Sequence, residues 1–278
     1  MNHSMPGWYQ LLKYAIYGLL MVNTVLFLQE ELLTFQHLFS GGIRAELVIQ
    51  AFSATIDTAA WVILLLMFEL ETYVLPDEVI RGKVKWSLHG LRLFCYLFIG
   101  YACYGYIVEM LHYYQVRELA VADACRLVSE DWSILVKLDE FQPLAAETCT
   151  SLQGQLWQVG SAQVVVDADK LSVTRWLAWT DVINSATWIL VVLLLEFDVR
   201  MQLKGAYKGR VLLLSKTAKV VLYGVLFVAA VYWGFEGDFL DFWDAFLWLV
   251  AFVFIEMNIF NWHAETMPDS ALESATTV

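Results

Sequence analysis

The chain has 278 residues, of which 59% are hydrophobic and 15% aromatic, and its mean hydropathy is +0.58. Soluble domains contain roughly 45–50% apolar residues, so this composition predicts that much of the chain lies in lipid. The formal net charge of −12 argues against a nucleic-acid-binding protein, because such proteins present Lys and Arg to the phosphates. We expect an all-α polytopic membrane protein with the lipid bilayer, and no nucleic acid, among its partners.

About six stretches are long enough to cross a bilayer, since one span needs roughly 20 mostly apolar residues. They cover residues 11–29, 47–68, 88–110, 174–195, 212–234 and 239–261. All four prolines lie outside them (Pro6, Pro76, Pro143 and Pro268), which predicts long, unbroken helices. No small-residue cleavage site follows the first stretch, so we interpret it as a retained helix and not as a signal peptide.

Between the third and fourth spans, residues 115–172 have too little continuous apolar sequence to cross a membrane. We expect a small folded insertion with a helix near 117–129 and three short strands, around 134–138, 155–159 and 163–166. The chain then divides into residues 1–114 with spans one to three, the insertion, and residues 173–278 with spans four to six and a short tail. Cys125 and Cys149 fall in the insertion and predict a disulfide; two unpaired thiols are the alternative.

The loop charges predict the orientation, because cytoplasmic loops carry an excess of Lys and Arg. The loops after the second and fourth spans are basic, with Arg81, Lys83, Lys85, Arg200, Lys204, Lys208, Arg210 and Lys216. The insertion is acidic on balance, and the charged residues of the turn after the fifth span are all acidic. We therefore expect both termini in the cytoplasm of a cell (inner) membrane and residues 115–172 outside.

An internal repeat is visible at a constant offset of 127 residues, where 56–96 matches 183–223 without a gap. The matching positions include tryptophans, acids, a base-Gly-base loop, a base and a tyrosine: Trp61 with Trp188, Glu69 with Glu196, Glu71 with Asp198, Arg92 with Lys219, and Tyr96 with Tyr223. The repeat predicts two tandem hairpins, 45–110 and 174–234, related by a pseudo-two-fold axis along the membrane normal.

Charged residues in the spans are expected to be paired, because an isolated charge in lipid is costly. We expect Glu69 to meet Arg92 and Glu196 to meet Lys219 near the cytoplasmic face. These interfacial pairs would fix each hairpin; the alternative is a charged vestibule to which Glu256 contributes. Trp61 and Trp188 lie deeper, and we interpret them as packing anchors, with a ligand platform as the alternative.

Asp57 is the deepest acid, and its repeat counterpart is Asn184. We expect it to point into the bundle toward Tyr101 or Tyr104. Two roles stay open: a proton or cation site, or a neutral acid that hydrogen-bonds to a phenol. Asp181, Glu109 and His112 lie nearer the outer surface and are expected to be interfacial.

The sequence lacks nucleotide-binding, metalloprotease and nucleophile-elbow motifs, so it predicts no catalytic residue, no metal site and no cofactor. We expect a non-enzymatic integral membrane protein that is a scaffold or accessory subunit of a membrane assembly; the alternatives are an ion channel or carrier and, third, a membrane-embedded enzyme. A scaffold or accessory subunit would use the acidic insertion to dock a membrane or extracytoplasmic partner, or a second copy of the chain. A proton or cation channel or carrier would use the pseudo-symmetry and Asp57. A membrane-embedded enzyme would need a cluster of acids at one interface.

Overall fold

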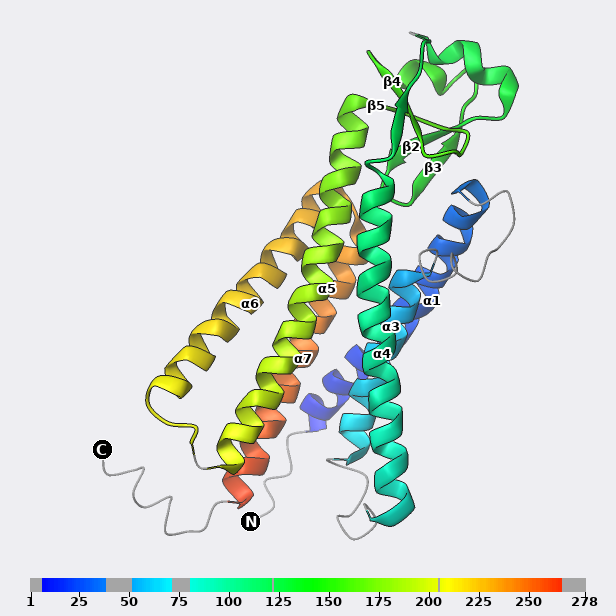
Figure 1. The fold of residues 1–278 in the computed structure, drawn as a ribbon. Coiled ribbons are helices and arrows are strands. Elements are labelled where there is room, and N and C mark those ends of the chain that lie inside the picture. The colour runs from blue at the N-terminus through cyan, green and yellow to red at the C-terminus, as the bar shows by residue number, and fades with distance from the viewer. Residues whose placement is uncertain (1–6, 39–51, 72–80, 122, 205, 267–278) are drawn as a thin grey trace.

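The computed structural model describes residues 7–38, 52–71, 81–121, 123–204 and 206–266, with side chains at all of these except 36–38, 202–203 and 253–266. Long helices dominate it and run nearly the full length of the molecule, as Figure 1 shows. Their bounds are α1 Gly7–Leu38, α3 Ser53–Glu69, α4 Gly82–His112, α5 Ala168–Leu203, α6 Arg210–Glu236 and α7 Phe239–Thr266. Each predicted span overlaps one of these helices, although residues 47–51 of the second span lie outside the described residues.

Four of the described helices are long and apolar enough to cross a membrane: Gly7–Phe35, Gly82–His112, Ala168–Met201 and Arg210–Glu236. Large apolar side chains remain exposed along them, including Leu93, Val220 and Phe227, each at least 60% exposed. A soluble protein rarely exposes contiguous apolar surface on this scale. The chain is therefore a mostly helical protein of the membrane class.

The helices form a closed ring. α3 packs against α1 and α4, α5 packs against α4 and α6, and α7 packs against both α6 and α1. Inside the ring lies a cluster of aromatic side chains, in which Trp61 of α3 and Trp188 of α5 have their ring centroids 6.4 Å apart. Trp248 and Phe252 of α7 also belong to this cluster, and the ring centroids of Phe252 and Trp188 are 4.5 Å apart. The two tryptophans that the repeat aligns thus meet at the centre of the bundle.

The insertion folds as a five-stranded sheet, so the molecule contains more than helices. Its strands are β1 Val116–Glu118, β2 Ser133–Lys137, β3 Glu140–Pro143, β4 Leu156–Val159 and β5 Val164–Asp167, in the order β1-β4-β5-β2-β3. Only the β2–β5 pair is parallel. The three strands predicted from sequence are confirmed as β2, β4 and β5, and Gly160 turns between the last two with a φ of 54°.

The helix predicted at 117–129 is wrong. Strand β1 occupies the start of that range, and a short 3-10 helix follows at Ala124–Glu130. Its start is fixed by Asp123, whose side chain accepts a hydrogen bond from the Cys125 amide at 2.9 Å. The predicted disulfide is confirmed: Cys125 and Cys149 are bonded, with Cα atoms 5.0 Å apart. The bond ties two 3-10 segments together, since Cys149 begins the second of them.

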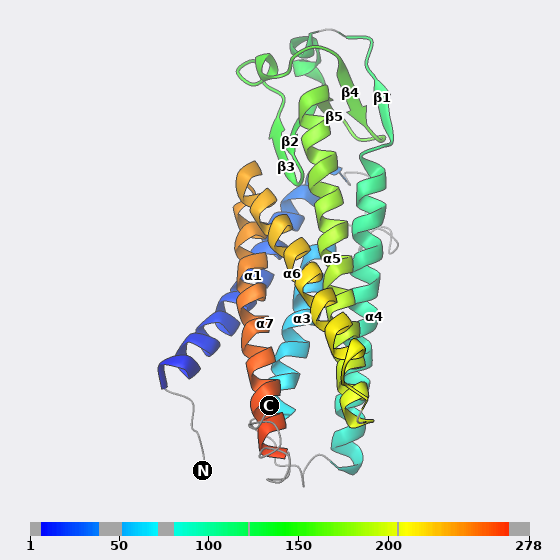
Figure 2. The ribbon, with the colours of Figure 1, turned by 90° about the vertical axis from the view of Figure 1, so that its left-hand side faces the viewer.

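The sheet sits on one end of the helical ring, where α4 and α5 run into it (Figures 1 and 2). Strand β5 passes directly into α5, whose first turn is capped by Asp167: its Oδ1 accepts a hydrogen bond from the Lys170 amide at 2.9 Å. His112 at the end of α4 packs so closely on Gly160 that a Cβ there would lie 2.7 Å from the imidazole. Sheet and helices therefore share one core at this end.

Candidate functional site

A cavity of about 80 Å³ lies inside the ring at the end that carries the sheet. One buried water needs roughly 10–15 Å³ on the same measure, so the cavity has room for several waters or a small ligand. Its walls come from α1, α3, α4, α5 and α7, with Trp233 added by α6 and the turn between β2 and β3 at the mouth. Chain segments far apart in the sequence therefore contribute to one space.

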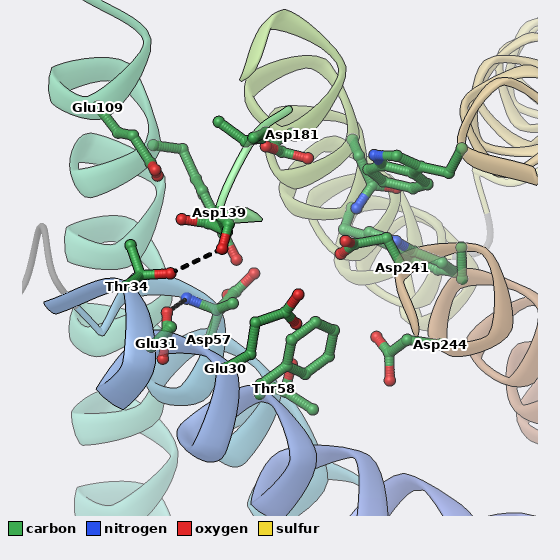
Figure 3. A pocket seen from close by; sticks show the side chains of 18 of the residues that line it. Glu30, Glu31, Thr34, Asp57, Thr58, Glu109, Asp139, Asp181, Asp241 and Asp244 are labelled. Atoms are coloured by element: carbon green, nitrogen blue, oxygen red, sulfur yellow. Dashed lines mark hydrogen bonds between the residues drawn. The ribbon is translucent and has the colours of Figure 1, made fainter. Parts of the chain in front are cut away.

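Carboxyl groups dominate the cavity. Figure 3 shows them reaching toward it from separate helices. The eight acids are Glu30, Glu31, Asp57, Glu109, Asp139, Asp181, Asp241 and Asp244. No Lys or Arg lines the cavity among the residues that the structure describes, and His112 is the one imidazole there. Such a set of acids repels itself when ionised, unless protons or cations enter.

Two of the acids are held by the fold. Glu31 of α1 caps the start of α3, because its carboxylate accepts hydrogen bonds from the Ala54 amide at 2.7 Å and from the Thr55 amide and hydroxyl. A carboxylate is favoured there by the unpaired amides of a helix N-terminus. Asp244 of α7 accepts a hydrogen bond from Asn23 of α1 at 2.9 Å. These contacts position the wall of the cavity.

Asp57 is different, because part of its carboxyl group has no partner. The side chain is 9% exposed and lines the cavity, and its Oδ1 atom has no hydrogen-bond donor among the described residues. Asn184 and the fully buried Tyr113 line the same cavity. The Oδ1 atom of Asn184 and the hydroxyl of Tyr113 also have no hydrogen-bond partner among the described residues. The indole Nε1–H of Trp233, a donor, also lines the cavity without a partner among the described residues. Buried polar atoms are normally hydrogen-bonded, so four unsatisfied atoms in one cavity point to a ligand or to ordered water.

The β2–β3 turn closes over the mouth of the cavity. The Asp139 carbonyl accepts a hydrogen bond from the Thr34 hydroxyl of α1 at 3.0 Å, and Lys137 donates to the carbonyl of Gly237, after α6, at 3.0 Å. Asp139 has a φ of 60°, a left-handed conformation that Asp tolerates better than most residues. Burial, with the nearby charge of Asp238, raises the pKa of Asp139 to about 7.

The floor of the cavity is aromatic. Trp61 lies one helical turn beyond Asp57 on α3, roughly 6 Å further from the sheet, and Trp188, Trp248 and Phe252 also line the cavity. All four are less than a tenth exposed. The cavity thus combines an acidic wall with a floor of packed rings. Trp61 and Trp188, which are expected to be packing anchors, also line the cavity.

The far end of the bundle carries ion pairs, but not those that the sequence predicts. Arg92 pairs with Glu71 at 2.6 Å and not with Glu69, and Lys219 pairs with Asp198 at 3.0 Å. In each pair, the acid that binds the base lies two residues later in the chain than the acid that the sequence predicts.

The two acids that the sequence assigned to these bases have other partners. Glu69 is bound by Lys13 of α1 at 2.5 Å and by the Tyr14 hydroxyl at 2.9 Å. Glu196 pairs with Arg200 at 3.3 Å and accepts a hydrogen bond from Tyr96 at 3.2 Å. Both acids therefore link the hairpins to neighbouring structure instead of closing them.

Tyr101 and Tyr104 do not line the cavity; they are 44% and 58% exposed on the outside of α4, and the expectation that Asp57 would point toward them is wrong. Counting the helical rise gives depth but not the direction in which a side chain points. Tyr106, two residues on, faces the cavity instead. The side chain of Glu256 lies outside the described residues.

Sequence reasoning missed most of the acidic wall. Glu109, Asp181 and His112 were expected at the outer interface, and the structure places all three on the cavity. Glu30, Glu31, Asp139, Asp241 and Asp244 were not singled out as a site. Asp139 lies in the β2–β3 turn, and the other four are acids near the sheet-proximal end of a helix. Such acids are ordinary at a membrane surface and become notable only when the ring brings these ends together.

In the described ranges, no group of three or more His, Cys, Asp or Glu side chains is arranged to hold a metal ion. The fold and cavity define a helical membrane protein with an acidic internal cavity. No protein-family model, no curated protein and no solved structure matches this chain.

Proposed function

We propose that this protein is a cation carrier or gated cation channel, which admits cations to the acidic cavity from the side of the sheet. One observation supports it above the others: eight carboxyl groups from five helices and one hairpin face a single cavity, with no Lys or Arg in its described lining. An ionisable group inside a membrane protein is by default a functional-site hypothesis. Here the groups share one space, and Asp57 at its floor lacks a donor.

The proposal includes six spans, with α3 and α7 crossing the membrane beside the four more evident helices. It is supported by the closed ring, in which each helix contacts two neighbours. The insertion would lie outside, because the Cys125–Cys149 disulfide persists in an oxidising compartment. Since α1 begins and α7 ends at the end of the bundle away from the sheet (Figure 2), both termini would then be cytoplasmic.

The proposal also includes the tandem repeat. The ion pairs Glu71–Arg92 and Asp198–Lys219 are related by the same offset of 127 residues in both members. Trp61 and Trp188 meet in the bundle, and Asp57 and Asn184 line one cavity. These contacts favour two hairpins facing each other, related by an axis along the membrane normal. The exchange of Asp for Asn across that axis leaves one ionisable group at the floor.

The end of the bundle away from the sheet is closed by polar contacts. The Lys13–Glu69 pair is nearly inaccessible, with side chains 2% and 7% exposed. Asp198 is held by Lys219 and by the Ser215 hydroxyl at 2.6 Å. In this proposal these contacts form the inner gate, which must open before a cation can leave the cavity toward the cytoplasm.

The direct test is cation flux in proteoliposomes that contain the full chain. Under an inside-negative potential, the entry of protons, Na⁺, Ca²⁺ and a labelled organic ammonium ion is measured one by one. We expect at least one of them to enter faster than in empty liposomes, and Asp57→Asn to slow that entry by about tenfold or more, because the floor loses its charge. Glu147→Gln, at an exposed site on the insertion, removes the same charge and should change nothing.

Flux indistinguishable from empty liposomes for every cation would contradict the proposal. Flux that Asp57→Asn leaves unchanged would contradict the role of the cavity. Either result, together with a partner protein or second copy that co-purifies in fixed proportion, would favour the scaffold function that the sequence left open.

A further inference from the structure

Three of the four unsatisfied atoms of the cavity can accept a hydrogen bond, and the fourth is the indole N–H of Trp233, which can only donate one. Asp57 Oδ1, Asn184 Oδ1 and the Tyr113 hydroxyl can each accept a hydrogen bond, and none has a partner in the described part of the chain. Asp57 and Tyr113 are both more than nine-tenths buried and line the cavity. The oxygens of Asp57 and Asn184 can only accept, so a ligand that satisfies them through hydrogen bonds must donate, whereas the Tyr113 hydroxyl can pair with either kind of group. The two acceptor-only oxygens favour an N–H-bearing cation over an anion or a neutral acceptor.

The aromatic floor adds a second requirement. Trp61, Trp188, Trp248 and Phe252 present rings to the cavity. A strongly hydrated metal ion gains little from such a surface, whereas an alkylammonium ion buries its methylene groups against it and is attracted to the ring faces. The floor therefore suits a cation with an aliphatic part.

The acids are spread along the cavity and are not gathered at one point. Asp139 comes from the β2–β3 turn and Asp241 from the first turn of α7, while Asp57 lies on α3 one helical turn from Trp61. In the described residues no three acids or histidines converge as ligands of a metal ion. Several separated negative charges match a ligand that carries several separated positive charges.

From these three features we infer that the cavity binds a linear polyamine, with one ammonium group at Asp57 and Asn184, aliphatic carbons against the tryptophans, and a further ammonium group among the acids at the mouth. This inference rests on the proposed cation function and names its substrate class. No covalent step is involved. The ligand stays protonated throughout, and its charge is balanced by the carboxylates that line the walls.

The test is calorimetric titration of the full chain in detergent near neutral pH with spermidine, putrescine, Ca²⁺ and Na⁺ in turn. We expect spermidine to bind more tightly than putrescine, because it has one more ammonium group for the acids. Asp57→Asn should weaken spermidine binding by about tenfold or more, as expected for a lost charge-assisted hydrogen bond. The matched control Glu147→Gln should stay within about twofold of wild type.

A competition experiment on the wild-type chain needs no variant and covers the case in which Asp57→Asn does not fold. Bound spermidine should resist Ca²⁺ and Na⁺ at equal concentration. If Ca²⁺ or Na⁺ binds and spermidine does not, the polyamine inference is overturned while the cation function stands. If none of the four cations binds, and none enters proteoliposomes, both fall together.

Discussion

Asp139 is a carboxyl group that the insertion brings against the acids of the helices. It interacts electrostatically with carboxyls on three helices and beyond the end of α6, namely Glu30, Glu31, Glu109, Asp181 and Asp238. Lys137, two residues before Asp139, pairs with Glu140 at 3.1 Å. Burial and the charge of Asp238 raise the pKa of Asp139 to about 7, well above the usual 3.8 of this group.

This shift predicts how stability depends on pH. Because the folded protein binds the Asp139 proton more tightly than the unfolded chain does, the contribution is complete below about pH 4 and is lost as the pH rises through about 7. The midpoint temperature of thermal unfolding in detergent should therefore decrease as the pH is raised from about 5 to about 8. Asp139→Asn should make this decline shallower, whereas Glu147→Gln should reproduce the wild-type slope. Equal slopes in all three proteins would show that Asp139 is not protonated in the fold.

The Lys13–Glu69 pair makes a second prediction at this scale. Its atoms are 2.5 Å apart and its side chains nearly inaccessible. Removing one member of a buried pair leaves an uncompensated charge, which costs roughly 3–5 kcal/mol. Lys13→Met should therefore strongly lower the free energy of unfolding, measured by denaturant titration in detergent. The double variant Lys13→Met with Glu69→Gln should recover much of that loss, and a double variant no better than the single would refute the pairing.

At the scale of elements, the two hairpins show what local pattern can and cannot supply. The strand positions in the insertion follow from short-range sequence, and the structure has strands there. The contact between Trp61 and Trp188 does not follow from local pattern, because the two residues are far apart in the chain. The sequence does not predict the partner of Arg92, because Glu69 and Glu71 both lie where α3 ends. The direction of a side chain there depends on how the helix ends. Glu69 also has Lys13 as a competitor, which comes from a helix outside the repeat.

The ion pairs Arg92–Glu71 and Lys219–Asp198 give the element-scale prediction. Lys219–Asp198 is more buried, with side chains 20% and 4% exposed, than Arg92–Glu71, at 35% and 22%. Lys219→Leu should therefore destabilise the protein more than Arg92→Leu, whose cost should be about 1 kcal/mol. Glu71→Gln should relieve part of the Arg92→Leu loss, and Glu69→Gln should not. Rescue by Glu69→Gln in place of Glu71→Gln, measured by the same unfolding titration, would restore the pairing expected from sequence.

At the scale of the whole molecule, the ring brings together acids that the sequence scatters over more than 200 positions, from Glu30 to Asp244. The membrane class follows from composition, because hydrophobic content is a property of the whole chain. The cavity could not be read in the same way, since it depends on which faces of the helices turn inward and on where the β2–β3 turn docks. Asp57 alone was singled out beforehand, because it is the acid deepest in a predicted span.

The central claim is that Asp57 meets cations inside the cavity, and carbodiimide labelling tests it most directly. Dicyclohexylcarbodiimide reacts with protonated carboxyl groups in apolar surroundings, and the modified residue is located by peptide mass spectrometry of the full chain in membranes. We predict that Asp57 is modified when no cation is added, and that saturating spermidine, or another cation found to enter the proteoliposomes, prevents most of the modification. If Asp57 is not modified, or is modified equally with and without every cation tested, the account of the cavity as a cation site is contradicted.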